Sequence, residues 1–454
     1  MVLNKLGIQK EDLLFNNHDL LLLLVPLMIE QVLNALMGTI DTVMVSNVGS
    51  ATISAVSLVD SINNLMLQVF LALAAGGTIV CSQYLGKQET EECNRAARQV
   101  FLTMLVISLA ITVLCVAFRN PLLRLIFGQV EADVMEASRT YFLVTALSYP
   151  FIALFNANAA FFRAEGNSRM PMIISVICNG INIAGNAIMI FGLDMGVLGA
   201  GLSTLFSRIV MAVVMICLQR RDKQTIVIRN YAKIRPELAL IAVILSVGIP
   251  TGIENGMFQF GKLAIQSTVS TLGTTTISAQ AMTNILEYLN SVAAMGVGIG
   301  LMTIVGQCIG AGKKDQAVYY IIKLSLIAEV TVVVTALLTL VLTRPVTQIA
   351  GMEQTSADLC YFMMKWITII KPFVWTLAFI PGYGMRAAGD VKFSMILSTV
   401  SMWVCRVSLC VYLCRVQGFG PIAVWIGMFT DWTVRGIIFS IRFRSRKWLQ
   451  HQVV

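Results

Sequence analysis

The chain has 454 residues, of which 57% are hydrophobic and only 13% are charged, and its mean hydropathy is +0.79. Soluble domains carry about a quarter charged residues, so a soluble globule is excluded and lipid must be the solvent for most of the chain. The net charge of +9 does not indicate a nucleic-acid partner, because the basic residues lie in short connections between apolar runs. The ten cysteines form no C-x-x-C pair, and the only histidines, His18 and His451, lie outside the apolar runs. We therefore expect no disulfide, no metal site and no cofactor.

Twelve apolar runs follow one another along the chain. Each reaches or exceeds the roughly 20 residues that an α-helix needs to cross the hydrocarbon core. The first run is too long for the apolar region of a signal peptide and lacks a small-residue cleavage pattern. The sequence therefore predicts an all-α integral membrane protein with twelve transmembrane helices, at residues 20–46, 53–80, 96–118, 138–160, 171–193, 196–219, 239–270, 277–308, 317–343, 355–385, 392–414 and 420–441.

Lysine and arginine are distributed unevenly between alternate connections. With the N-terminus in the cytoplasm, 21 of the 33 basic residues fall in inside segments and five in outside loops, while seven lie within apolar runs. Cytoplasmic loops of membrane proteins carry the excess of basic residues. We therefore expect a multi-pass protein of the cell inner (plasma) membrane with both termini in the cytoplasm.

The two halves of the chain resemble each other at an offset of 224 residues. That offset aligns Pro26 with Pro250 and Glu30 with Glu254. Further matches are GSATISA from Gly49 with GTTTISA from Gly273, Gly76 with Gly300, Gln83 with Gln307, and, at an offset of 222, YPF at Tyr149 with KPF at Lys371. So many identities at one offset indicate an internal duplication.

Each half holds six predicted spans, so the halves share one orientation and are expected to be related by a pseudo-two-fold axis along the membrane normal. We predict an N-terminal six-helix bundle at 1–219, a cytoplasmic linker at 220–238 and a C-terminal six-helix bundle at 239–454. Rocking of one bundle against the other would alternate access to a cleft between them. This organisation favours a transporter over a receptor, an intramembrane enzyme or a pure channel.

Two glycine-rich stretches do not support a nucleotide site. GAGKK at 310–314 lacks the glycine spacing of a phosphate loop and the hydroxyl residue that follows its lysine. GVGIG at 296–300 lies inside an apolar run, where small residues let helices approach closely. No Ser–His pairing and no zinc-binding helix motif is present, so we expect neither ATP dependence nor enzymatic activity.

Six motifs in a fixed order resemble the multidrug and toxic compound extrusion (MATE) family, over essentially the whole length of the chain. They are P-x14-D from Pro26 to Asp41, TIDTVMVSNVG around Asp41, Q-Y-L-G after the second helix, FRAEGNSRMP after the fourth, N-I-x-x-N on the fifth and GAGLST on the sixth. The resemblance implies a cation-coupled exporter of bulky, often cationic and aromatic compounds.

Carboxylates inside apolar runs need an explanation, because a charged residue at mid-bilayer costs roughly 3 kcal/mol by insertion measurements. Glu30 precedes Asp41 by eleven residues, which places both on one helix face about 16 Å apart, and Asn34 shares that face. The residues alone allow a cation or proton site, or a carboxylate that only bonds neighbouring helices. The family resemblance places the coupling carboxylate of the N-terminal bundle at Asp41.

Three asparagines recur on one face of the fifth helix: Asn179, Asn182 and Asn186. Their amides can coordinate a cation or hold a protonated carboxylate, and Thr204 is a further candidate for this cluster. DinF-like members of the family carry an aspartate where Asn186 stands. The resemblance therefore favours simple protonation over a sodium site with two carboxylates.

Glu254 mirrors Glu30 across the repeat, which suggests paired carboxylates that face the cleft and attract cationic substrates. A structural hydrogen bond inherited through the duplication is the equal alternative. NorM-like members carry a glutamate one turn later, where this chain has Phe258, and their tenth-helix aspartate aligns near Trp375. The NorM-type cation site of the C-terminal bundle is therefore not expected.

Basic residues inside the last helices also need partners. Arg406 lies midway along the eleventh helix, and Asp431 and Arg435 are one turn apart on the twelfth. We expect a structural ion-pair cluster that holds the two helices together. The roles of Lys262, Lys365 and Lys371 stay open.

Together these features predict a secondary active multidrug exporter, which couples inward proton or sodium flow to extrusion of small, often cationic amphipathic compounds. We expect a monomer with small drug-like substrates and membrane lipid as its partners, and no nucleotide or nucleic acid. Two alternatives stay open at this point: a lipid-linked oligosaccharide flippase, and another six-plus-six secondary transporter such as a major facilitator.

Overall fold

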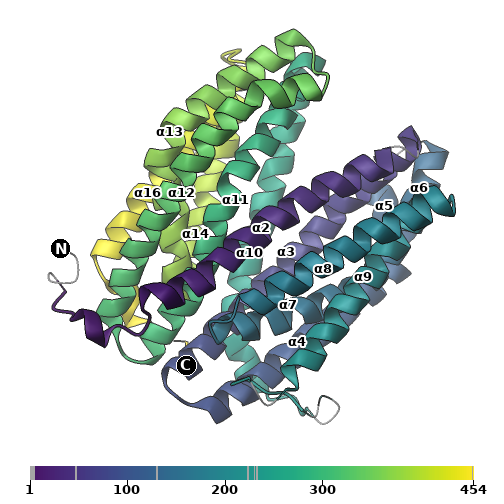
Figure 1. Ribbon diagram of the computed structural model, residues 1–454. Helices are drawn as coiled ribbons and strands as arrows, with labels where there is room; N and C mark the ends of the chain where they lie inside the picture. The colour runs from purple at the N-terminus through teal and green to yellow at the C-terminus, as the bar shows by residue number, and fades with distance from the viewer. Residues whose placement is uncertain are drawn as a thin grey trace. The chain divides into compact units, whose positions relative to one another are not determined.

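The computed structural model describes residues 6–46, 49–128, 131–221, 224–229, 231, 234–451 and 453–454. Within the helices, it leaves undescribed the side chains of Lys10, Thr39, Asp41, Thr42, Val43, Val45, Ser46, Ser50 and Ala51. The described part of the chain is helical and contains no strand, and twelve of its stretches are long and apolar enough to cross a membrane. The predicted fold class is thereby confirmed (Figure 1).

The first half of the chain holds six spans. They are formed by α2 (Asn17–Ser46), α3 (Ser50–Gly86), α4 (Thr90–Ala117), α6 (Ala132–Leu147) with α7 (Tyr149–Ala164), α8 (Arg169–Asn186) with the π-helix η2 (Ala187–Gly192), and α9 (Gly196–Gln219). The short helices η1 (Lys10–Asp12) and α5 (Arg119–Phe127) lie between or before them. The fourth span is one predicted run, but it is divided into two helices at Ser148. Pro150 lies in the first turn of the second helix, where its missing N–H costs nothing.

The second half repeats this order. Its spans are α10 (Leu238–Val269) with η4 (Ser270–Leu272), α11 (Thr274–Gly310), α12 (Lys314–Ile349), α13 (Gln354–Ala387), α14 (Val391–Ser401) with the π-helix η5 (Met402–Ser408) and α15 (Leu409–Arg415), and α16 (Ile422–Arg444). A short helix, η6 (Lys447–Gln450), follows.

The chain forms two compact units, and they divide the first helix of each repeat. One unit, here the C-unit, comprises Met1–Val32 and Ile253–Val454, and the other, the N-unit, comprises Leu33–Gly252. Both α2 and α10 therefore begin in one unit and end in the other. The predicted bundles at 1–219 and 239–454 differ from these units chiefly in the early parts of α2 and α10.

Glycines explain why these helix segments pack where they do. In the N-unit, a Cβ at Gly76 of α3 would lie 3.0 Å from the carbonyl oxygen of Ile244 on α10. In the C-unit, a Cβ at Gly296 of α11 would lie 2.8 Å from the backbone nitrogen of Met28 on α2. Only glycine permits such close approach of two helix backbones. The contacts fix the start of α10 on the N-unit and the start of α2 on the C-unit.

The predicted linker is packed against the N-unit where it is described. Ile226 and Ile228 are fully buried. The Val227 amide donates to Asn94 Oδ1 (2.7 Å), and Gln219 Nε2 donates to the carbonyl of Ile226. A segment predicted as a connection is thus part of the folded N-unit.

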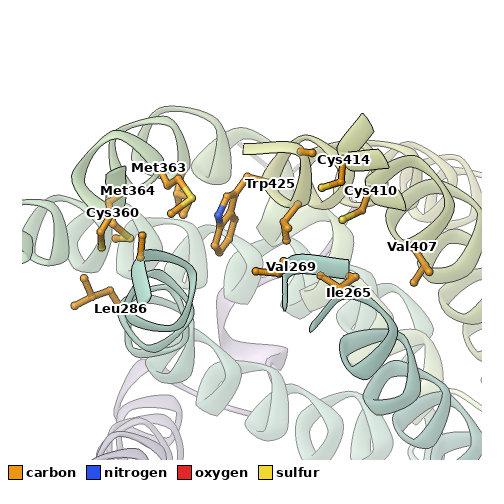
Figure 2. Close-up of a cluster of buried hydrophobic side chains, with 14 of the residues drawn as sticks. Ile265, Val269, Leu286, Cys360, Met363, Met364, Val407, Cys410, Cys414 and Trp425 are labelled. Carbon is orange, nitrogen blue, oxygen red and sulfur yellow. The ribbon is translucent and has the colours of Figure 1, made fainter. Parts of the chain in front are cut away.

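A hydrophobic cluster of the C-unit combines aliphatic side chains with methionine, cysteine and tryptophan. Figure 2 shows this cluster around Trp425, with Met363, Met364 and Cys410 among its buried members. The Trp425 indole donates to Gln280 Oε1 (3.1 Å), which satisfies its buried N–H. The described cysteines are free, as small packing residues.

Candidate functional site

The N-unit contains a polar, partly open cavity of about 570 Å³ between its membrane-spanning helices. Its walls come from the second part of α2 and from α3, α6, α8 and α9. Polar and charged side chains that line it include Asn34, Asp60, Tyr141, Asn186, Thr204 and Arg208. Polar groups at membrane depth are stable only where they face one another or a water-filled space, so this cavity is the candidate functional site.

Asn34 connects α2 to α8 at the cavity. Its Oδ1 accepts hydrogen bonds from Ser175 Oγ (3.0 Å) and Asn179 Nδ2 (3.4 Å). The asparagine face predicted for the fifth helix therefore meets the polar face predicted for the first. The side chain of Asp41, seven residues further along α2, lies outside the described residues.

Asn182, Asn186 and Thr204 are brought together by α8 and α9. Asn182 Nδ2 donates to Thr204 Oγ1 (3.3 Å), and Asn186 Nδ2 donates to Asn182 Oδ1 (3.3 Å). The carbonyl of Asn182 also accepts from Ser203 Oγ (2.8 Å). Immediately after Asn186, η2 winds with the wider π-helical turn, a local irregularity that often marks functional sites. The structure thus places three of the four predicted coupling residues in one hydrogen-bonded cluster.

A second chain of hydrogen bonds reaches the cavity through Asp60 on α3. Asn63 Nδ2 donates to Asp60 Oδ1 (3.1 Å), and the Tyr141 hydroxyl of α6 donates to the same oxygen (3.4 Å). Tyr149 of α7 donates to Asn63 Oδ1 (2.8 Å). Asp60 is therefore part of a hydrogen-bond network that connects α3 to α6 and α7, the two helices of the fourth span.

Arg208 on α9 supplies the positive charge of this cavity. Its guanidinium donates to Ser148 Oγ (2.7 Å) and acts electrostatically on Asp60. Neither Asp60 nor Arg208 is among the site residues predicted from the sequence. The available signal was their charge: Asp60 is an acid within the apolar run 53–80, and Arg208 is a base within the run 196–219. A charged side chain within a membrane-spanning run costs free energy at these two positions just as it does at Asp41.

The residues predicted for the substrate cleft divide between the units. Glu30 is buried, with 2% of its surface exposed, and belongs with Glu254 to the C-unit, whereas Asn34 belongs to the N-unit. Glu254 Oε2 accepts from Arg386 at 3.1 Å, and the same guanidinium lies over the Tyr383 ring. Glu254 is thus already neutralised by a cation of its own unit.

The C-unit contains a buried ion pair that the sequence analysis did not foresee. Lys371 Nζ lies 2.6 Å from Glu287 Oε1, donates to Ser291 Oγ (2.5 Å) and sits over the Trp375 ring. The lysine side chain is fully buried, while Lys365 on the same helix is exposed. Lys371 therefore has a partner 84 residues away, which no local sequence signal indicates.

Arg406, Asp431 and Arg435 contact one another in the C-unit. Arg406 lies 2.6 Å and Arg435 3.2 Å from the two oxygens of Asp431, and all three side chains are buried. Arg406 stands on the π-helix η5, which lies in the fifth span of its half, as η2 does in the N-unit. Lys262 lies over the Phe258 ring. Among the described residues, no three histidine, cysteine, aspartate or glutamate side chains gather as a metal ion would require.

Comparison with known proteins identifies the family. The MatE family profile matches residues 26–188 and again residues 250–412, so the two matches are themselves offset by 224 residues. The chain is 28% identical to the uncharacterized transporter YisQ of Bacillus subtilis, over 94% of this chain and 93% of that protein. It is 26% identical to the probable multidrug resistance protein NorM of Thermotoga maritima, over 98% and 96% of the two chains.

Solved structures confirm the fold. A crystal structure of MATE in complex with MaL6 superposes with a TM-score of 0.86 at 20% identity, covering 94% of this chain and 95% of that one. An outward-facing multidrug resistance MATE transporter gives a TM-score of 0.85 at 19% identity, with the same coverage. The profile matches span well over half of the chain. The chain therefore belongs to the MatE family of multidrug and toxic compound extrusion transporters, and it is a multi-pass membrane protein.

Proposed function

We propose that this chain is a secondary active exporter, which couples inward flow of a proton or sodium ion to extrusion of small, often cationic amphipathic compounds. The observation that carries the proposal is the polar, charge-bearing cavity between the membrane-spanning helices of the N-unit. A cavity that exposes ionisable groups at membrane depth is costly unless an ion or solute uses it. The family membership supports export as the direction of use.

In this proposal, Asp41 is the carboxylate that the coupling ion neutralises, and Asn182, Asn186 and Thr204 help to bind the ion. Binding of the cation neutralises the carboxylate and changes the hydrogen bonds between α2, α8 and α9. Because α2 begins in the C-unit and ends in the N-unit, a rearrangement at its cavity end can be transmitted to both units. Substrate release then follows from cation entry.

The substrate class is proposed from relatives and from charge. Relatives include the probable multidrug resistance protein NorM of Thermotoga maritima and the multidrug export protein MepA of Staphylococcus haemolyticus, 24% identical over 75% of both chains. We assign Glu30, Asn34 and Glu254 to substrate attraction. At Glu254, a cationic substrate has to compete with the Arg386 guanidinium for the carboxylate. The protein acts as a monomer in the inner (plasma) membrane, with both termini in the cytoplasm.

The test is drug efflux from proteoliposomes that contain the purified full-length protein. Ethidium or a fluoroquinolone should be transported when a pH or sodium gradient is applied, and not when neither is present. The Asp41→Asn variant should lose at least tenfold of the coupled rate, because an amide cannot titrate. Asp133→Asn, an exposed acid at the start of α6, serves as the matched control and should transport as the wild type does.

Equal transport by Asp41→Asn and the wild type would refute the coupling role of Asp41. Flux that is independent of any counter-ion would indicate a channel. Transport of a lipid-linked oligosaccharide without transport of either drug would indicate a flippase instead of a multidrug exporter.

A further inference from the structure

A cluster of charged side chains in the C-unit carries more positive than negative charge. Its members act on one another across α10, α11, α13, η5 and α16. Among the described side chains that interact here, four are bases and two are acids: Lys262, Lys371, Arg406 and Arg435 against Glu287 and Asp431. We propose that this cluster binds a small monovalent anion, a halide or a carboxylate, beside Arg406.

Ion pairing within the cluster does not remove the excess charge. Lys371 and Glu287 neutralise each other at 2.6 Å. Asp431 has two arginine partners, at 2.6 Å and 3.2 Å, and a guanidinium does not lose its proton at physiological pH. One positive charge therefore stays uncompensated whatever the protonation state of Lys262. A buried charge without a counter-charge is costly, and a bound anion offsets that cost.

Two buried hydrogen-bond donors of this cluster lack an acceptor. Arg406 and Trp432 are only 2% and 1% exposed, and neither the Arg406 Nε nor the Trp432 Nε1 has a hydrogen-bond partner among the described residues. Both groups are donors only, so no change of tautomer can satisfy them. The Arg406 guanidinium lies 5.9 Å from the centre of the Trp432 ring, which makes the two side chains neighbours. Unsatisfied donors beside an excess positive charge favour an acceptor that is itself negative.

Lys262 brings a further cation to the same place. Its Nζ lies 5.0 Å from the centre of the Phe258 ring, and the Arg406 guanidinium lies 5.1 Å from the centre of that ring. Two cations at one ring repel each other, and a nearby anion reduces the repulsion. Lys262 is exposed whereas Arg406 is buried. The cluster therefore reaches the molecular surface at Lys262, where an anion can enter.

The internal repeat shows that the cluster stands where the N-unit has its candidate site. At the offset of 224, three members of the cluster align with residues of the N-unit: Lys262 with Gly38, Glu287 with Asn63 and Arg406 with Asn182. Gly38 and Asn63 line the N-unit cavity, and Asn182 belongs to the hydrogen-bonded cluster of α8 and α9. Equivalent positions thus carry neutral residues in one half and mainly basic residues in the other. The C-unit counterpart suits an anion, and its occupancy does not depend on the coupling ion of the N-unit.

The experiment compares thermal unfolding of the purified full-length protein in the sodium salts of chloride, acetate and methanesulfonate. A ligand that binds only the folded state raises the unfolding temperature as its concentration exceeds its Kd. Chloride or acetate, titrated against methanesulfonate at constant ionic strength, should raise this temperature by several degrees. Saturation by chloride identifies a free halide as the ligand, and saturation by acetate alone identifies the carboxylate group of a solute. An unfolding temperature that is the same in all three salts would overturn the anion site.

Two variants locate the site. Trp432→Phe removes one unsatisfied donor and keeps an aromatic ring, and Lys262→Gln removes the exposed positive charge. Each should weaken the apparent anion affinity several-fold. The exposed residues Trp366 and Lys365 of α13 supply the matched controls. Trp366→Phe and Lys365→Gln should respond to the anion as the wild type does.

The outcomes for the variants decide the assignment. Arg406→Gln also deprives Asp431 of a partner, so the two milder variants carry the test. Unchanged anion affinity in both of them would place the anion elsewhere and overturn the proposal. No transport is measured, so failure of the exporter function and failure of the anion site are distinguished.

Discussion

The N-unit and the C-unit are built from one duplicated sequence, yet equivalent positions line a cavity in the N-unit and pack in a hydrophobic cluster in the C-unit. Ala200 and Thr204 of α9 line the N-unit cavity. Their counterparts at the offset of 224, Val424 and Met428 of α16, pack in the hydrophobic cluster around Trp425 (Figure 2). Larger apolar side chains at equivalent positions have closed the space. The difference teaches that duplication preserved the helices, while side-chain volume at equivalent positions decided whether space remained between them.

Backbone geometry supports this register. Gly196 and Gly420, separated by 224 residues, both have positive φ angles, of 55° and 65°, just where α9 starts and before α16. Such a conformation is strained for residues with a Cβ. The same turn therefore precedes the last helix of both halves, and the positions that follow can be compared directly.

Buried polar pairs show the same contrast. Tyr149 and Asn63 form a neutral hydrogen bond beside the cavity, at 2.8 Å. Their repeat counterparts are Lys371 and Glu287, which form an ion pair at 2.6 Å in the C-unit. The same two positions of the repeat thus carry a neutral hydrogen bond in the N-unit and an ion pair in the C-unit. We interpret the C-unit pair as a structural clamp.

The largest expected effect comes from breaking this clamp. Lys371→Ala leaves Glu287 buried without its cation, and loss of one partner of a buried ion pair costs about 3–5 kcal/mol. The variant should unfold at much lower temperature or denaturant concentration than the wild type. The double variant Lys371→Tyr with Glu287→Asn imports the N-unit pair and should recover most of the loss. A double variant no more stable than Lys371→Ala would show that the two sites are not equivalent.

Filling the cavity is the next test of the comparison. Thr204→Met introduces the residue of the C-unit position and should reduce drug transport at least tenfold, with the protein still folded. Thr204→Val removes the hydroxyl but adds little volume, so the difference between the two variants measures the effect of filling. In the C-unit, Met428→Thr should destabilise the protein by about 1–3 kcal/mol and leave the coupling ion unchanged. Equal transport by Thr204→Met and Thr204→Val would contradict a role for the cavity volume.

Much of the fold could be predicted because its signals are local. Apolar runs long enough to cross the bilayer give the twelve helices, and offsets between identical segments give the duplication. The face shared by Asn182 and Asn186 follows from helical periodicity. The division of α2 and α10 between units could not be predicted, since it depends on close approaches at Gly76 and Gly296 to helices far away in the sequence.

Long-range pairing also explains what was missed at the site. Lys371 is 84 residues from Glu287, and Asp60 is 81 residues from Tyr141. Asp60 could still have been singled out, because an acid in an apolar run is itself a signal. Asp60 matches neither the family pattern around Asp41 nor an acid in the repeat, because it aligns with Asn284 in the second half.

The smallest effect concerns the turns that follow the fourth span and its repeat, RAEGN at 163–167 and RAAGD at 386–390. In the second turn, Asp390 is paired with Arg442 at 2.7 Å. In the first, Glu165 Oε1 accepts from the Ile226 amide of the linker (2.5 Å). Burial raises the pKa of Glu165 from 4.5 to about 7, although backbone hydrogen bonds from Ile226 and Thr225 oppose the rise. The carboxyl group of the second turn is thus paired with an arginine, whereas that of the first turn is bonded to the backbone of the linker.

Docking of the linker should therefore depend on pH. With the linker docked, Glu165 holds its proton up to about pH 7, whereas a released, solvated carboxyl group loses it near 4.5. The state that binds more protons is favoured at low pH, so this contribution to docking is complete below pH 4.5 and is lost as pH rises through 7. Amide hydrogen exchange at Ile226 and Val227, corrected for intrinsic rates, should be several-fold faster at pH 8 than at pH 6. Glu165→Gln keeps the acceptor oxygen but cannot titrate, so its corrected exchange should be independent of pH; the same pH dependence in both proteins would exclude Glu165 as the cause.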